Sequence, residues 1–172
     1  SDNTGAKNDI ADIISLFNPN WDEEKDSDIC FHEAKELALT ILRKKIDLIK
    51  SEQRAESFIN KALKNASDNI LILSTRAPWK KLVAETDIEF TIYPSDRGGY
   101  SAQAVSKTPD TTELKIPFPQ EWRGKRGDQL KEISKIETLN FCHNSGFLIA
   151  TGTQKDAISA CKLARKLYLE KQ

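Results

Sequence analysis

The sequence has few of the residues that build metal centres and disulfide frameworks. Its 172 residues include two histidines, three cysteines and no methionine. The cysteines form no CxxC pair, are odd in number and lie in apolar stretches, which is typical of reduced thiols packed as small apolar side chains. We therefore expect a reducing, cytoplasmic compartment. A metal site needs three or four converging ligands, so the composition disfavours a metal centre within this chain.

The sequence also lacks net charge and long apolar runs. Lys and Arg total 26, as do Asp and Glu, so no overall field draws the protein to nucleic acid or to a membrane. Any contact with a polyanion must be local, which favours a short nucleotide ligand over a long RNA. No apolar run approaches the roughly 18 residues of a membrane span, and we expect a soluble protein without a membrane partner.

The beginning of the chain is polar, and the lack of methionine leads us to expect a piece of a longer protein. The stretch from 1 to 26 is expected to be an arm with a short amphipathic helix around 10–17, held to the body by Trp21. From Trp21 to Ala77 there is neither glycine nor proline, and apolar residues recur every three to four positions. This pattern predicts one long helix, or two in line, over about 28–66.

The remainder of the chain alternates between strand and helix signals. Short apolar runs predict a strand at 70–74, a hairpin over 88–105 and two short strands, or one bent strand, around 139–151. A helix is expected near 127–135, and Thr153 followed by Asp156 predicts the start of a C-terminal helix. The pattern indicates an α+β domain with a small mixed sheet, covered by the terminal helix and by part of the long one.

His143 is the first candidate functional residue. It follows Cys142 on a predicted strand, so the two side chains should point to opposite faces, which argues against a Cys–His nucleophile pair. An outward imidazole beside Ser145 and Gly146, with Thr153 opening a helix nearby, would suit an anion. An ordinary turn between two strands is the alternative.

Two further segments combine glycine with positive charge. In "WRGKR", residues 122–126, an aromatic stands beside three cations, a combination used to stack a base and hold its phosphates. Arg97 precedes Gly98-Gly99 at a predicted hairpin tip and could aim a guanidinium at a phosphate. Taken alone, surface charge on a loop is the favoured explanation of the first segment, and turn geometry is the favoured explanation of the second.

Six motifs in register carry a family resemblance: "FNPNWDE", "APWKK", "YPSDRGGYSAQAV", "PFPQEWRGKRGDQL", "FCHNSGFL" and the capped C-terminal helix. Together they resemble the C-terminal half of the melanocyte proliferating gene one (Myg-one) exonuclease family, relatives of the DHH phosphoesterases. The likeness runs from about Asp2 to Leu169. Two departures stand out: Ile149-Ala150 replaces a common glycine pair, and Lys115 stands where arginine is usual.

The resemblance implies a metal-dependent phosphodiesterase that cleaves RNA from 3′ to 5′. A divalent metal, Mn or Mg, would be bound by an N-terminal DHH-like domain absent from this chain, which would be a partner of this half. Residues 1–26 would then be the arm left from that domain, and 27–172 a substrate-binding domain like the DHH-associated one, inactive alone. The expected contacts to RNA or a short oligonucleotide are His143, Ser145, Gly146, Arg123, Trp122, Arg97 and Tyr100, with Trp122 or Tyr100 stacking a base.

Two other functions remain open at this point. The chain could be a non-catalytic interaction module in which the long helix forms a homodimer interface, or part of a phosphodiesterase for small nucleotides. A substrate site predicts that His143, Arg123 and Trp122 line one exposed surface, whereas the interaction module requires no such grouping.

Overall fold

The computed structural model describes residues 10–171, and the expectations for residues 1–9 lie outside this range. The chain divides into two compact units, residues 1–52 and 53–172. The division falls within one long helix, α2 (Ser27–Leu63), where the apolar spacing predicted either one long helix or two in line. The predicted start of the second domain, residue 27, is the point where this helix begins.

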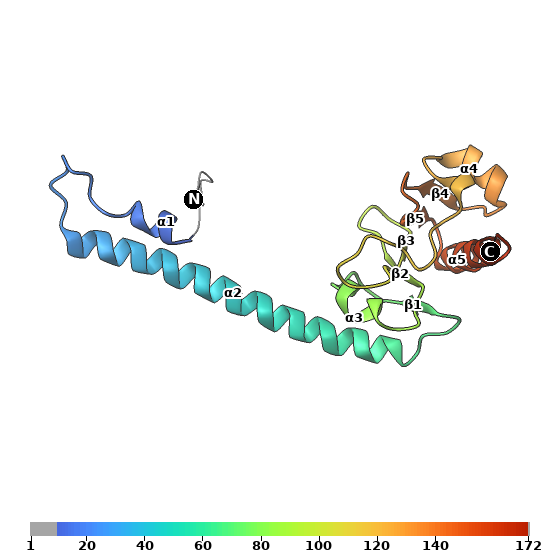
Figure 1. Ribbon diagram of the computed structural model, residues 1–172, viewed down its shortest axis with the longest axis horizontal. Helices are drawn as coiled ribbons and strands as arrows, with labels where there is room; N and C mark the ends of the chain where they lie inside the picture. The colour runs from blue at the N-terminus through green and yellow to red at the C-terminus, as the bar shows by residue number, and fades with distance from the viewer. Residues whose placement is uncertain (1–9, 172) are drawn as a thin grey trace, which may run out of the picture. The chain divides into compact units, whose positions relative to one another are not determined.

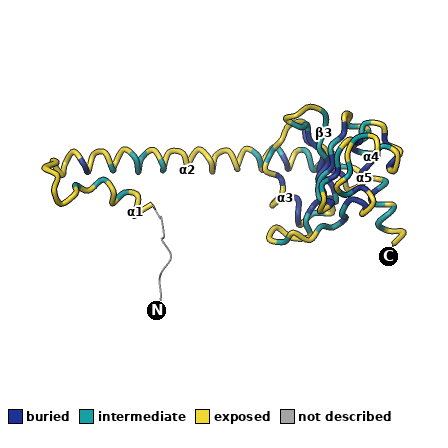
Figure 2. Tube along the Cα trace, turned by 90° about the horizontal axis from the view of Figure 1, so that it is seen from above, coloured by how far each residue is buried: buried dark blue, intermediate teal, exposed yellow. Residues whose placement is uncertain are grey.

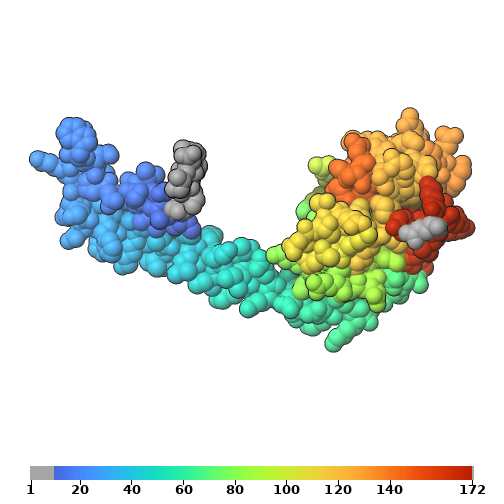
Figure 3. All heavy atoms as spheres, in the orientation of Figure 1, coloured from blue at the N-terminus to red at the C-terminus, as the bar shows by residue number. Residues whose placement is uncertain are grey.

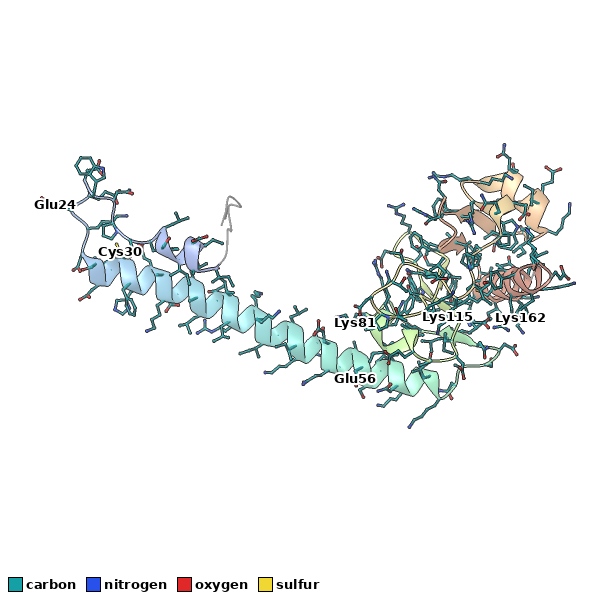
Figure 4. The ribbon with its side chains drawn as sticks, in the orientation of Figure 1. Glu24, Cys30, Glu56, Lys81, Lys115 and Lys162 are labelled. Atoms are coloured by element: carbon teal, nitrogen blue, oxygen red, sulfur yellow. The ribbon has the colours of Figure 1, made fainter. Side chains whose placement is uncertain are left out.

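The first unit contains α1 (Ile10–Ser15) and the N-terminal turns of α2. Cys30 is its one buried residue among those described, and Figure 4 labels it near the start of α2. Trp21 is 98% exposed, so the expectation that it fastens the arm to the body was wrong. Most of the unit is drawn as exposed in Figure 2.

The second unit is built on a five-stranded sheet of order β1-β2-β3-β5-β4 (Figure 1). Only the β1–β2 pair is parallel, so the sheet is mixed as expected. The strands are β1 (Ile70–Ile72), β2 (Phe90–Pro94), β3 (Tyr100–Ala104), β4 (Leu139–Cys142) and β5 (Leu148–Thr151). The helices are α3 (Lys80–Ala84), the short 3-10 helix η1 (Gln120–Trp122), α4 (Gly127–Ser134) and α5 (Gln154–Leu169).

Two apolar clusters cover the two faces of the sheet, because side chains alternate along each strand. Phe90 and Ile92 of β2 pack in the cluster that includes α5, whereas Tyr93 packs in the cluster with α3 and the end of α2. Ile59 of α2 is fully buried there. Both helices expected to cover the sheet therefore do so, and the α+β prediction is confirmed.

The close approach of α5 to the sheet follows from small side chains on its inner face: Ala157, Ala160, Cys161 and Ala164 are all buried. The helix begins at the expected place, since the Thr153 side chain accepts a hydrogen bond from the Asp156 N–H at 3.1 Å. None of the helices within residues 10–171 is both long and apolar enough to span a membrane.

Candidate functional site

The turn between β4 and β5 forms the centre of the candidate site. The His143 N–H donates to the Leu148 carbonyl at 2.9 Å, and the Gly146 N–H donates to the His143 carbonyl at 2.9 Å. Gly146 has φ +68°, a left-handed conformation that glycine adopts without the cost a Cβ would add. The backbone therefore fixes the position of the imidazole.

The orientation of the His143 ring is set by Ser145. The Ser145 N–H donates to Nδ1 of His143 at 3.2 Å, and the Ser145 Oγ lies 2.9 Å from the same nitrogen. Because a backbone N–H can only donate, Nδ1 is the acceptor, and the proton of the neutral ring is on Nε2. The Phe147 ring lies beside the imidazole, 4.5 Å between centroids. His143 thus offers an Nε2–H donor in a fixed orientation.

Cys142 is the last residue of β4, whereas the half-buried His143 begins the turn. Cys142 is fully buried, and burial raises the pKa of its thiol to about 11. A thiol that stays protonated is a poor nucleophile. The pair is therefore no Cys–His catalytic couple.

The loop 118–126 is fastened to this turn by backbone hydrogen bonds. The Phe118 N–H donates to the Gly146 carbonyl at 2.8 Å, and the Gly124 N–H donates to the Cys142 carbonyl at 3.1 Å. Gly124 has φ +74°, and a Cβ there would come within 2.6 Å of the Asn144 Oδ1. The motifs "WRGKR" and "CHNSGF" therefore form one surface.

The side chain of Arg123 lies against the turn. Its Nε donates to the Phe118 carbonyl at 3.1 Å, and a Cβ on Gly146 would come within 3.1 Å of its Cζ. Among residues 10–171 it forms no ion pair, so its terminal nitrogens keep their hydrogen-bonding capacity. Arg126 lies over the Phe141 ring, 5.1 Å from its centroid. The site thus presents two guanidiniums beside one imidazole.

Trp122 does not share this exposure. It is 2% exposed and stacks on Phe118 in the core, with ring centroids 6.4 Å apart. This burial corrects the expectation that Trp122 stacks a base, because an indole that is 2% exposed has no free face for a ligand. Its large apolar surface instead anchors the loop that carries Arg123.

Arg97 and Tyr100 lie at the other end of the sheet. Tyr100 pairs with Thr151, whereas Leu148, next to the His143 turn, pairs with Gln103. These positions are three residues apart, about 10 Å at the usual rise of a strand. The expectation that Arg97 and Tyr100 join His143 is therefore wrong, and Thr153, which follows β5, also lies at the far end.

The two departures from the family pattern lie on β5 and on the segment that follows β3. Ile149 is buried in β5 and pairs with Ala102, so its side chain belongs to the core. Lys115, labelled in Figure 4, donates to the carbonyls of Thr86 and Ile88, and burial lowers its pKa. The Ile149 side chain thus belongs to the core, and the Lys115 ammonium is bound to backbone carbonyls.

No group of three or more histidine, cysteine, aspartate or glutamate side chains converges anywhere within the described part of the chain. The described residues therefore do not fit a divalent metal. Sequence reasoning overlooked Phe147 and Phe141, the rings beside His143 and Arg126, although both stand within the quoted "FCHNSGFL".

Comparison with known proteins identifies the family. Residues 1–167 match the family model MYG1_exonuc, "Uncharacterised protein family (UPF0160)". The "MYG1 protein" of Dictyostelium discoideum is 31% identical over 87% of this chain and 50% of the relative. The "MYG1 protein C694.04c" of Schizosaccharomyces pombe is 31% identical over 91% and 52%, and the human "MYG1 exonuclease" is 29% identical over 91% and 46%.

The chain thus spans about half the length of these curated relatives. No solved structure matches it significantly. Because the family model covers nearly all of the sequence, the chain belongs to the MYG1 exonuclease family.

Proposed function

We propose that this chain is the substrate-binding half of a phosphodiester-cleaving hydrolase that acts as a 3′-to-5′ exoribonuclease, and that it binds RNA without cleaving it. Its ligand is the end of a single-stranded RNA or a short oligonucleotide. The observation that carries the proposal is the placement of the Arg123 guanidinium directly against the Gly146 turn that fixes His143. The family name of the human relative supports the hydrolase class.

The phosphate would lie between His143 and Arg123. Nε2–H of His143 and the terminal N–H groups of Arg123 are donors, and the fork of a guanidinium matches two phosphate oxygens at once. The Ser145 N–H, which donates to Nδ1, keeps the proton of the neutral ring on Nε2. Lys125 is half-buried, and its Nζ donates to the Glu121 carbonyl at 2.6 Å. Because this partner is a neutral carbonyl, the ammonium charge adds to the positive potential of the loop.

Hydrolysis is assigned to the part of the relatives that this chain does not match. There a DHH-like domain would bind a divalent metal, Mn or Mg, and bring it to the phosphodiester held by this half. The described residues supply no ligand set for that metal, and their part is to bind and orient the RNA.

A second function is favoured by one observation on α2. Leu42, Ile46 and Ile49 are spaced four and three residues apart, and each is more than 40% exposed. This spacing forms one apolar stripe, which could pair with a second copy of the chain. A homodimer is compatible with RNA binding, and an Ile46→Glu variant that stays dimeric by light scattering would exclude this stripe as the interface.

The proposal is tested by titrating the chain with a fluorescently labelled short single-stranded RNA and with a mononucleotide, at low salt and without added metal. Wild type should bind saturably, and His143→Ala and Arg123→Ala should each weaken binding by about tenfold or more, the loss expected for a charge-assisted contact. Arg97→Ala is the matched control, because Arg97 is exposed at the opposite end of the sheet. Equal affinity of all four proteins would overturn the proposal.

A further inference from the structure

A groove runs beside Arg123, between the loop that precedes it and the C-terminal half of α5. Its volume is about 410 Å³, within the range of small-ligand sites. The loop side includes Phe118 and Gln120, and the helix side includes Ala164, Leu167 and Tyr168. In Figure 3 the yellow loop region and the red C-terminal helix lie next to each other at the surface.

The walls of the groove are apolar, for a reason visible in the sequence of α5. Ala164, Leu167 and Tyr168 are spaced by three and four residues, so they share one face of the helix. Ala164 is 1% exposed and its small side chain leaves space, while Leu167 and Tyr168 are half-buried at the sides. Tyr168 therefore presents an aromatic ring to the groove without being enclosed by the core.

The charge of the groove is concentrated at Arg123. Lys171 also lines it but is paired with Glu121 at 2.9 Å, which offsets its charge. Arg123 belongs both to the groove and to the His143 turn, since it lies against Gly146. A ligand that fits both features has an apolar planar part for the groove and an anion next to it.

We propose that the groove is a base subsite, in which Tyr168 stacks on the base of the nucleotide whose phosphate lies between Arg123 and His143. The inference rests on the proposed function, and it assigns to Tyr168 the base-stacking role that the sequence suggested for Trp122. Leu167 and Ala164 contact the edge and ribose through apolar surface. Every base has a π face, so stacking on Tyr168 does not by itself select one of the four bases.

The test compares binding of a short single-stranded RNA with binding of an abasic strand of the same length, for wild type and Tyr168→Ala. Loss of a stacking ring should weaken RNA binding by about 5- to 100-fold, the usual range for one base. Binding of the abasic strand should not change. Tyr168→Phe, which keeps the ring, should bind RNA as wild type does.

A second pair of variants tests the base subsite if Tyr168→Ala does not fold. Leu167→Glu places a carboxylate inside the groove, and Leu169→Glu places the same carboxylate on the exposed side of α5, where Leu169 is 60% exposed. We expect only Leu167→Glu to weaken RNA binding. Equal affinity of these two variants, or a loss for Tyr168→Ala that is the same with the abasic strand, would overturn the base subsite.

Failure of this inference is distinguishable from failure of the proposed function. If Arg123→Ala and His143→Ala weaken binding of both strands while the groove variants bind normally, the phosphate site stands and the base subsite is wrong. If Arg123→Ala, His143→Ala, Tyr168→Ala and Leu167→Glu all leave RNA binding unchanged, both the base subsite and the proposed function are wrong. If only Tyr168→Ala and Leu167→Glu weakened RNA binding, the idea that one nucleotide occupies both the groove and the phosphate site would also be wrong.

Discussion

The side chain of Arg123 lies so close to Gly146 that a Cβ at Gly146 would come within 2.5 Å of its Nε. This contact joins the two motifs of the site, because Arg123 belongs to the loop and Gly146 to the strand turn. It also gives glycine two functions here, a left-handed backbone conformation and space for a guanidinium.

Gly146→Ala should therefore disturb both stability and RNA binding. The left-handed conformation costs a residue with a Cβ about 1–2 kcal/mol, and the added methyl group must also displace Arg123. Gly98→Ala is the control, since Gly98 has φ +87° but nothing within 4 Å of the added Cβ. In urea denaturation both variants should lose stability, with Gly146→Ala losing more. Only Gly146→Ala should bind RNA less well, and equal binding by the two would contradict the contact.

Arg123 should contribute to RNA binding through its charge and geometry. Arg123→Ala should weaken binding by about 1–3 kcal/mol and make the slope of log K against log salt shallower by about 0.7, the value for one phosphate of a single strand. Its hydrogen bond to the Phe118 carbonyl adds about 0.5–1.5 kcal/mol of folding stability that the variant also loses. Arg123→Lys keeps the charge and should retain the salt slope while losing part of the affinity.

Trp122 should behave as a core residue. Trp122→Ala is expected to cost about 3–5 kcal/mol of stability, because it removes a buried aromatic ring, whereas the 98% exposed Trp21 should tolerate alanine with a change within about 0.5 kcal/mol. Thermal melting measures both. A Trp122→Ala variant that melted like the wild type would contradict this position in the core.

The buried thiol of Cys142 predicts a loss of stability at alkaline pH. Burial raises its pKa from 9.0 to about 11, so the folded state disfavours the thiolate that the unfolded chain forms readily. Its contribution is fully present below pH 9 and should fall as the pH rises toward 11, by about 2 kcal/mol in total. The difference in unfolding free energy between wild type and Cys142→Ala should shrink over this interval, and a constant difference would contradict the assignment.

The sequence was most informative where periodicity was clear. The spacing of apolar residues predicted the helical stretch of α2, as one helix or two in line, and Thr153 marked the start of α5. Trp21 was expected to be packed and is exposed, whereas Trp122 was expected to be exposed and is buried. The local sequence around an aromatic residue in a turn-rich loop does not distinguish the two cases. Arg97 and Tyr100 were assigned to the site since strand order was unknown, and only the pairing of β3 with β5 separates them from His143.

The groove beside α5 could not be expected from local sequence. Ala164 and Tyr168 fit an ordinary amphipathic helix, and the space between that helix and the loop depends on where loop 118–126 is fastened. Long-range backbone hydrogen bonds, such as Phe118 N–H to the Gly146 carbonyl, leave no mark on side-chain patterns.

The most direct measurement is a nitrogen NMR titration of the two imidazole rings with a short single-stranded RNA. In the free protein, the neutral His143 ring should carry its proton on Nε2, as the Ser145 contact to Nδ1 requires. On adding RNA, the His143 ring signals should shift and those of the exposed His32 should remain in place. RNA binding that leaves the His143 signals unchanged would contradict the account.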